Sequence, residues 1–419
     1  MVTASSSEDP TAPVKGIVAT KTLSATKTAA GLVKTPQSVS VITRDQMAAL
    51  DVTSVSQALR YSAGVFTEYR GSSNRNDEVF VRGFSYVPKY LDGLSYGATA
   101  SSQTGTMDPW LLERVELVRG PASVLFGQVN PGGLISMTSK RPTSQPVHEI
   151  QFRTGNDNLA EGAFDLGGPL SDDGHLLYRL NGIARSQNSQ VEDYKETRVA
   201  IAPALTWYPN DATRFTLLTS YQKDPDAGYR NFLPRYGTVN NVDGSYIPRD
   251  FNVSDPSYNQ SWREQTLIGY EFEHQLNDML TLRQNARYGT IKQKYRYLVY
   301  SSSEANSSVL SRRAQHEERQ TDEFGIDNQL EAQFATGQLA HTVLSGLDYK
   351  TSKDKQYLGR AGGSQYDLDW RAPVYGVKVD ESTFRTASDE QQNLDQVGLY
   401  LQDQLSLENW ELLLSGRYD

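Results

Sequence analysis

The stretch QTLIGYEFEHQLNDMLTLRQNARYG, residues 265–289, decides the fold, because it repeats one alternating pattern on both sides of a short turn. In its second half, Leu280 and Tyr288 fall on one face of an extended chain. Arg283 and Arg287 fall on the opposite face. Successive side chains of a β-strand point to opposite faces, so the pattern predicts strands with one apolar and one water-facing side.

Nine further segments after residue 146 repeat this alternation. Most of the predicted strands have 11 residues or more, whereas strands of soluble proteins usually have about 5–6. A tilted strand that crosses a membrane needs about 9–11 residues. The eleven predicted strands are 149–155, 160–168, 176–186, 198–208, 213–223, 265–275, 279–289, 322–334, 339–350, 395–407 and 409–418.

The connections between these strands alternate in length after the first hairpin. Residues 169–175, 209–212, 276–278, 335–338 and 408 are short turns, and residues 187–197, 224–264, 290–321 and 351–394 are longer loops. Short turns on one side and long loops on the other are typical of an outer-membrane β-barrel. A secreted β-sheet protein with long insertions is the alternative, but it has no reason to sort its loops in this way.

Eleven is an odd number of strands, whereas bacterial single-chain barrels close with even numbers. Two open strand edges would also leave backbone groups unpaired in the membrane. We therefore expect the sequence to be the N-terminal part of a protein of about 690 residues, if the barrel has twice as many strands.

The composition narrows the class of protein further. The 419 residues carry a net charge of −9 and no cysteine, which argues against a nucleic-acid binder and excludes disulfide scaffolds and thiolate metal sites. No run approaches eighteen apolar residues, so no transmembrane helix is expected. Residues 1–34 are rich in Ser, Thr, Ala and Lys and predict a mobile N-terminal arm without a secretory signal.

Residues 35–145 have a different, mixed α+β pattern and predict one compact domain of about 110 residues. TPQSVSVIT (35–43) alternates as a strand does, and residues 44–59 suit short amphipathic helices. A strand is predicted at 78–84, and 108–127 predicts a helical turn, a strand and a Gly-Pro turn.

The order of motifs in both parts resembles the TonB-dependent outer-membrane receptors of the ferric-siderophore class. The first part of the barrel is most similar to the ferrichrome and hydroxamate receptors. The motifs are TPQSVSVIT (35–43), QALRYSAGV (57–65), VRGF (81–84), YLDGL (90–94), LERVELVRGPASVLFG (112–127) and NPGGLISMTSKRP (130–142), then YRLNGIAR (178–185), VAIAPALTWYPND (199–211), GYRNFLP (228–234), LRQNARY (282–288) and GRYD (416–419).

The resemblance implies an α+β plug domain (35–145) followed by an antiparallel transmembrane β-barrel (146–419), which has 22 strands in the family and about 11 here. It implies uptake of a ferric siderophore across the bacterial outer membrane, driven by the TonB complex of the inner membrane. The remaining partners are outer-membrane lipid and, in some members, phages or colicins. The siderophore carries the iron, so no protein cofactor or metal ligand is expected, and the five histidines have no metal-binding spacing.

The resemblance also implies a ligand site made from plug loops and long barrel loops. In the plug, Arg70 matches a ligand-contacting arginine, and Tyr86 lies on a shorter neighbouring loop. Arg230 stands where relatives place an aromatic residue, so ligand selectivity can differ. The barrel candidates are aromatic, because such side chains offer a large contact area with a polar handle; they are Tyr229, Phe232, Tyr295, Tyr297, Tyr300 and Tyr357. Any one of these tyrosines could instead belong to the membrane-interface girdle.

Two further roles are carried over from the family. Arg82 and Arg119 match paired plug arginines that form ion pairs with barrel carboxylates, and those carboxylates are expected beyond Asp419. The stretch VKGIVATKT (14–22) is a candidate for the energy-coupling segment that adds a strand to TonB, although it lacks the usual acidic residue.

Two other classes of function stay open from the residues alone. A passive porin or adhesin barrel would not need a domain of 110 residues before its first strand. A secreted glycosidase would need two carboxyl groups in a cleft, but the acidic pairs Asp172-Asp173 and Glu317-Glu318 lie in predicted turns and loops. We therefore expect a receptor and not an enzyme.

Overall fold

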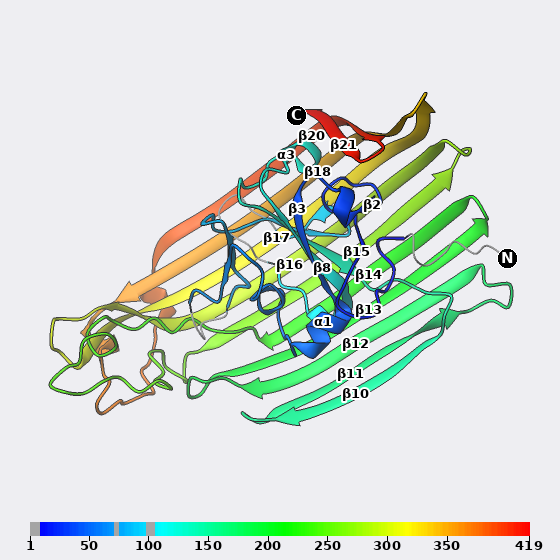
Figure 1. Ribbon diagram of the computed structural model, residues 1–419. Coiled ribbons are helices and arrows are strands. Elements are labelled where there is room, and N and C mark those ends of the chain that lie inside the picture. Colours follow the sequence, from blue (N-terminus) through cyan, green and yellow to red (C-terminus); the bar gives the residue numbers. More distant parts are fainter. Residues whose placement is uncertain (1–8, 71–74, 98–104) are drawn as a thin grey trace.

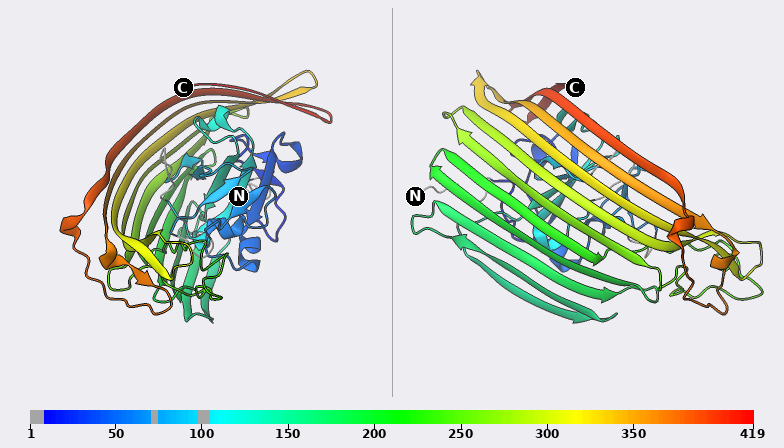
Figure 2. Two further views of the ribbon diagram at one scale, coloured as in Figure 1. Left: turned by 90° about the vertical axis from the view of Figure 1, so that its left-hand side faces the viewer. Right: turned by 180° about the vertical axis from the view of Figure 1, so that it is seen from behind.

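The computed structural model describes residues 9–70, 75–97 and 105–419 (Figure 1). A small α+β domain, the plug, lies on the concave side of a large curved antiparallel sheet (Figure 2). Among these residues, no helix is both long and apolar enough to cross a membrane.

The plug is built on a five-stranded sheet in the order β3-β8-β9-β6-β7. The strands and helices predicted between residues 35 and 142 are present. The sheet contains β3 (Ser38–Thr43), β8 (Leu112–Arg119), β9 (Gly133–Ser139), β6 (Lys89–Leu91) and β7 (Leu94–Ser95), and the plug also contains α1 (Arg44–Ala49), α2 (Val55–Ala58), α3 (Ser123–Phe126), the 3-10 helices η1 (Leu32–Lys34) and η2 (Pro109–Leu111), and the hairpin of β4 (Val65–Thr67) and β5 (Val79–Val81).

Local side chains decide where the two first helices begin. Thr43 ends β3, and its Oγ1 accepts a hydrogen bond from the backbone N of Gln46 at 3.2 Å at the start of α1. Ser54 accepts one from the backbone N of Gln57 at 3.2 Å at the start of α2. Hydroxyl side chains at this position satisfy backbone donors that a helix leaves unpaired.

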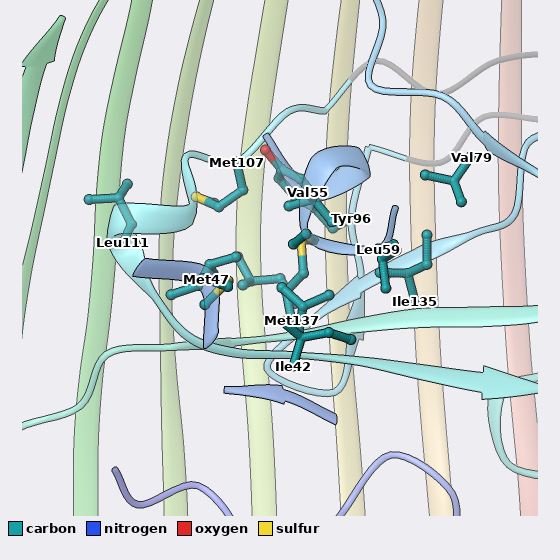
Figure 3. Close-up of a cluster of buried hydrophobic side chains, with 14 of the residues drawn as sticks. Ile42, Met47, Val55, Leu59, Val79, Tyr96, Met107, Leu111, Ile135 and Met137 are labelled. Atoms are coloured by element: carbon teal, nitrogen blue, oxygen red, sulfur yellow. The ribbon is translucent and has the colours of Figure 1, made fainter. Parts of the chain in front are cut away.

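An apolar core holds the helices of the plug against its sheet (Figure 3). Val115 and Leu117 of β8 and Ile135 of β9 are completely buried there. The neighbouring Arg114 and Glu116 of β8 are also buried, but on the other side of the strand. The plug therefore buries apolar side chains inside itself and charged side chains on its outside.

In the described residues, the large sheet has twelve strands. Eleven of them are consecutive antiparallel neighbours and confirm the predicted segments and their order, and the twelfth is the short β19, which pairs with β17. Each predicted segment overlaps one strand. They are β10 (Val147–Gly155), β11 (Leu159–Pro169), β12 (Leu176–Asn188), β13 (Lys195–Asn210), β14 (Thr213–Asp226), β15 (Gln260–Gln275), β16 (Leu280–Ser302), β17 (Val309–Thr336), β18 (Leu339–Gly362), β20 (Arg385–Leu407) and β21 (Trp410–Tyr418).

Two of the predicted long loops are wrong in extent. Residues 290–321 are mostly strand, because β16 and β17 continue and leave only 303–308 between them. In the same way β18 and β20 shorten the predicted loop 351–394 to 363–384, which contains the short strand β19 (Leu368–Asp369). Both faces of these extensions carry polar residues, so the alternation that marks a membrane strand disappears although strand pairing continues.

The remaining long loops pack on each other at the same end of the sheet. Val242 and Phe251 of loop 227–259 and Trp370 of loop 363–384 are buried together against Leu310 of β17. We refer to this end as the long-loop end; the connections at the opposite end are short.

The predicted mobile arm is, in part, packed against the barrel. β1 (Lys21–Thr22) and β2 (Ala30–Gly31) pair with each other, and Lys27 between them forms a buried ion pair with Asp327 of β17 at 2.8 Å. Thr22 Oγ1 also donates to Glu116 of the plug at 2.5 Å. These contacts place the segment of residues 21–31 between plug and wall, and the mobility of the rest of the arm stays a prediction.

Candidate functional site

The end of the plug between β4 and β5 carries Arg70, and we call its described residues, 69–70 and 75–78, the plug apex. Arg70 Nε donates to Glu78 Oε2 at 2.9 Å, and its guanidinium lies 4.5 Å from the ring centroid of Tyr69. Asn76 Nδ2 donates to the second oxygen of Glu78 at 3.2 Å. Burial raises the pKa of Glu78, but the hydrogen bonds from Arg70 and Asn76 outweigh burial and hold that pKa below its usual value. The carboxylate therefore fixes the direction of Arg70.

The loop that follows β14 meets the plug apex at Phe232. The ring centroid of Phe232 lies 5.2 Å from the Arg70 guanidinium. Tyr86, which is 40% exposed, is close enough to Arg70 and Tyr69 to influence their ionisation. The structure thus brings two predicted ligand residues, Tyr86 and Phe232, near the cation of a third, Arg70, at the long-loop end.

Tyr229 is a buried residue of the same loop as Phe232. It is only 3% exposed, and its ring stacks on Tyr194 at 4.3 Å. Ser189 Oγ donates to its hydroxyl at 2.6 Å, and its carbonyl accepts from the backbone N of Arg75 at 3.3 Å. Tyr229 therefore joins the loop after β14 to the loop between β12 and β13 and to the plug, and its predicted ligand contact stays a prediction.

Tyr295 and Tyr297 of β16 face the plug, where both contact Arg75. The Arg75 guanidinium lies 4.3 Å from the ring centroid of Tyr295, and its Nη1 donates to Tyr297 Oη at 3.3 Å. It also pairs with Glu317 of β17 at 3.0 Å, and its carbonyl accepts from Arg263 at 2.6 Å. The sequence did not single out Arg75, because an arginine in a polar loop resembles any solvated residue.

Tyr300 and Tyr357 do not join that cluster. Tyr300 is five residues after Tyr295 and lies on the opposite face of β16, where it packs against the buried loop residues of the long-loop end. Tyr357 of β18 pairs with Glu318, whereas Tyr295 pairs with Glu317, so it also lies on the outer face. The predicted tyrosine cluster is therefore divided between two faces of the wall.

Arg82 and Arg119 lie together on a different face of the plug, beside β3 and β8. Arg119 Nε donates to the carbonyl of Ala63 at 2.8 Å, and its Nη1 donates to Ser40 Oγ at 2.9 Å. Burial and the nearby Arg82 lower the pKa of Arg119. Neither arginine is ion-paired within the described part of the chain, and their pairing with barrel carboxylates stays a prediction.

Other ion pairs, which the sequence did not indicate, fasten the plug to the wall. Asp108 of the plug accepts hydrogen bonds from Arg185 at 3.0 Å and Arg198 at 3.1 Å. Burial raises the pKa of Asp108, but the two arginines outweigh it and lower that pKa. Arg141 pairs with Glu271. A hollow of about 310 Å³ lies between the plug, at Arg70 and Asp77, and the strands β12–β14, at Arg185 and Asp224.

In residues 9–70, 75–97 and 105–419, no group of three or more His, Asp or Glu side chains is arranged to hold a metal ion. It stays a prediction that the siderophore carries the iron and that no protein side chain coordinates it.

Both parts of the chain match known families. Residues 32–134 match the TonB-dependent Receptor Plug Domain, and residues 204–419 match the family described as TonB dependent receptor-like, beta-barrel. Among curated proteins, the ferrichrome outer membrane transporter/phage receptor of Escherichia coli K12 is 36% identical over 97% of this chain and 58% of its own length. The ferrioxamine B receptor of Salmonella typhimurium SL1344 is 38% identical over 94% of this chain and 56% of its length. The chain thus spans little more than half the length of these relatives.

Solved structures share the fold. FpvA of Pseudomonas aeruginosa, bound to a heterologous pyoverdine, superposes with a TM-score of 0.82 at 18% identity, over 95% of this chain and 53% of that one. The siderophore receptor PiuA of Acinetobacter baumannii superposes with a TM-score of 0.78 at 22% identity, over 93% of this chain and 58% of that one.

Proposed function

Because the chain belongs to the TonB-dependent receptor family of the bacterial outer membrane, we propose that the protein takes up a ferric hydroxamate siderophore, similar to ferrichrome or ferrioxamine. The single observation that carries this proposal is the surface around Arg70, where a fixed guanidinium meets the aromatic rings of Tyr69 and Phe232. An arginine can donate to hydroxamate oxygens, and the rings can cover the apolar periphery of the ligand. The relatives named for ferrichrome and ferrioxamine support this class of ligand.

A receptor for another ferric siderophore is the alternative within the family. A passive porin or adhesin is a weaker alternative, because the lumen side of the sheet is occupied by a folded plug. The ion pairs of Asp108 and Arg75 fasten this plug to the wall. A pore that serves diffusion would gain nothing from such an obstruction.

Energy coupling would use residues 14–22. Ile17 and Val18 in this stretch are 61% and 73% exposed, and Gly16 N donates to Asp45 at 2.6 Å just before them. An exposed apolar pair of this kind suits the addition of a strand to TonB of the inner membrane. Outer-membrane lipid would contact the outward-facing apolar residues of the strands, such as Trp207.

Phage or colicin docking stays a prediction. The Escherichia coli relative is named as a phage receptor as well as a ferrichrome transporter. The packed loops 227–259 and 363–384 would offer the first surface that such a particle meets.

The proposal is tested by uptake in iron-starved cells. Deletion of the gene, together with redundant receptors, should abolish uptake of radiolabelled ferrichrome or ferrioxamine B, and the gene supplied in trans should restore it. Unchanged uptake of both siderophores would contradict the hydroxamate proposal.

The residues are tested by tryptophan-fluorescence quenching with the same ligands. Arg70→Ala should weaken binding about tenfold or more, because a hydrogen bond from a charged donor is lost. Arg60→Ala is the matched control, since Arg60 also pairs with a plug glutamate, Glu68, but on an exposed surface. Equal affinities of the two variants would contradict the role of Arg70.

A further inference from the structure

Three arginines, Arg70, Arg75 and Arg230, come together where the plug apex meets the loop after β14. Two of them have carboxylate partners: Arg70 pairs with Glu78 at 2.9 Å, and Arg75 pairs with Glu317 at 3.0 Å. Arg230 has no ion pair among the described residues, and its Nε is buried without a hydrogen-bond partner there. The segments 71–74 and 98–104, which lie outside the described residues, contain no Asp or Glu in the sequence. In the described part of the chain, these three arginines therefore share two carboxylates, and Glu317, the partner of Arg75, also acts on Arg230, so the cluster keeps one positive charge in excess.

The side chains of the two residues next to Arg230 in the sequence hold its segment of the loop in place. Tyr229 before it stacks on Tyr194. Asn231 after it donates from Nδ2 to the carbonyl of Phe251 at 2.9 Å and accepts from the backbone N of Val253 at 2.9 Å. The guanidinium of Arg230 is consequently presented by a fixed segment of loop.

The same phenylalanine ring contacts two of the arginines. The ring centroid of Phe232 lies 5.9 Å from the Arg230 guanidinium and 5.2 Å from that of Arg70. Burial together with Arg75 and Arg70 lowers the pKa of Arg230, but an arginine stays charged at any physiological pH. Arg230 is thus a permanent cation beside the predicted ligand surface.

A half-buried cation among other cations is unfavourable unless an anion compensates it. The planar guanidinium suits a carboxylate, which it can bind through two parallel hydrogen bonds. The core of a ferric trihydroxamate is neutral, because three hydroxamate anions balance Fe³⁺. The compensating charge would therefore come from a group at the periphery of the siderophore.

We propose that Arg230, beside Arg70 and Phe232, forms a subsite for a peripheral carboxylate of the siderophore, so that the receptor prefers an anionic ferric trihydroxamate to a neutral or cationic one. This inference rests on the proposed uptake of hydroxamates and specifies which members of that class the site selects.

Three ligands with one core test this preference: ferrioxamine B with its terminal ammonium, its N-acetyl derivative, which is neutral, and its N-succinyl derivative, which ends in a carboxylate. Affinities are measured by fluorescence quenching on the receptor as the cell produces it. The succinyl form should bind about tenfold more tightly than the acetyl form, because a charge-assisted pair is gained. The ammonium form should bind most weakly.

Substitutions in this loop test whether Arg230 causes the preference for the succinyl form. Arg230→Gln should bring the succinyl and acetyl affinities together, while affinity for the acetyl form changes by no more than about twofold. Arg230→Lys keeps the charge without the planar fork and should retain part of the preference. Arg235→Gln removes an exposed charge from the same loop and should leave the preference unchanged.

The outcomes separate this inference from the proposed function. Binding of all three ligands with equal affinity, or a preference that survives in Arg230→Gln, would overturn the subsite alone. An Arg230→Gln receptor that loses affinity equally for all three ligands would also overturn it, since that result indicates a structural role. Failure of the wild-type receptor to bind any of the three would overturn both the subsite and the hydroxamate proposal.

Discussion

The interior of the plug and its contact surface with the barrel are both buried, but they are made from different residues. In the interior, Val55, Ile135 and Met137 pack in an apolar core (Figure 3), which also contains Leu117. At the contact surface, Asp108 and Arg141 of the plug pair with Arg185 and Glu271 of the wall. Lys27, in the segment 21–31 between plug and wall, pairs with Asp327 in the same way. Wall residues such as Ile183 and Leu267 continue the apolar core across this second surface, but the surface differs from the core in the charges that it neutralises pair by pair.

This difference predicts whether the core of the plug or its contact with the wall separates first. A core of apolar side chains loses its contacts together, and its burial drives folding without any directional bond. Ion pairs are directional, and water can solvate both partners once they part. The plug would therefore move or loosen relative to the wall as a folded unit before its own core opens.

The largest effect is expected inside the plug. Leu117→Ala should destabilise the plug by about 4 kcal/mol, because a completely buried leucine leaves a cavity. Hydrogen exchange of the β8 and β9 amides measures this loss. Val33→Ala, at a fully exposed position of η1, is the control and should change the exchange little. A similar response to the two substitutions would remove the distinction between core and surface.

A somewhat smaller effect is expected when one ion pair of the contact surface is broken. Lys27→Ala leaves Asp327 buried with two hydrogen-bond partners in the described part of the chain, Tyr400 and Gln329. The loss should be about 3 kcal/mol, because the remaining carboxylate is uncompensated. It is measured as faster exchange and proteolysis of residues 20–32, with β8 and β9 still protected.

The double variant Lys27→Met with Asp327→Leu refines this comparison. Replacing both charges with apolar side chains should restore most of the lost stability, because no unpaired ion then remains buried. A double variant as unstable as Lys27→Ala would show that the pair contributes more than mutual neutralisation.

The difference between apolar and charged surfaces also explains which parts of the fold could be predicted from the sequence. The eleven strands were predictable because one face of each meets an apolar environment, and this leaves an alternating pattern, as in 279–289. The pattern failed at 290–321, where β16 and β17 continue with polar residues on both faces. Strand pairing there depends on backbone hydrogen bonds, which leave no signal in the side chains.

The candidate site was predictable only in part, for a related reason. Arg70 and Phe232 were identified through motifs, and the structure brings them together. The partners of Lys27 and Arg75 lie 300 and 242 residues away along the chain. No local pattern relates such residues, because their pairing depends on how the plug is placed against the wall.

A third effect is a change of stability at alkaline pH, which depends on Lys140 at the contact surface. Burial lowers the pKa of Lys140 to about 8, although Asp165 at 2.8 Å opposes that shift. Between this value and about 10.4, where an unfolded lysine loses its proton, the unfolded chain binds more protons than the folded one. Stability should therefore rise from pH 8 to pH 10, by on the order of 2 kcal/mol.

Chemical denaturation at a series of pH values measures this rise. In Lys140→Met the rise should disappear, whereas the acid limb of the profile, which depends on carboxylates such as Asp108, should stay. A profile that is flat from pH 8 to pH 10 in the wild-type protein would contradict the assignment to Lys140.

The smallest effect is expected where an ion pair of the same chemistry is exposed. Arg60 and Glu68 of the plug are 2.7 Å apart, but their side chains are 46% and 36% exposed. Water screens such a pair and solvates whichever partner remains, so Arg60→Ala should cost no more than about 0.5 kcal/mol in the exchange measurement. A loss as large as that of Lys27→Ala would mean that charge pairing, and not burial, sets the strength of the plug contacts. A loss near zero would mean that the larger loss in Lys27→Ala comes from the burial of Asp327 away from water.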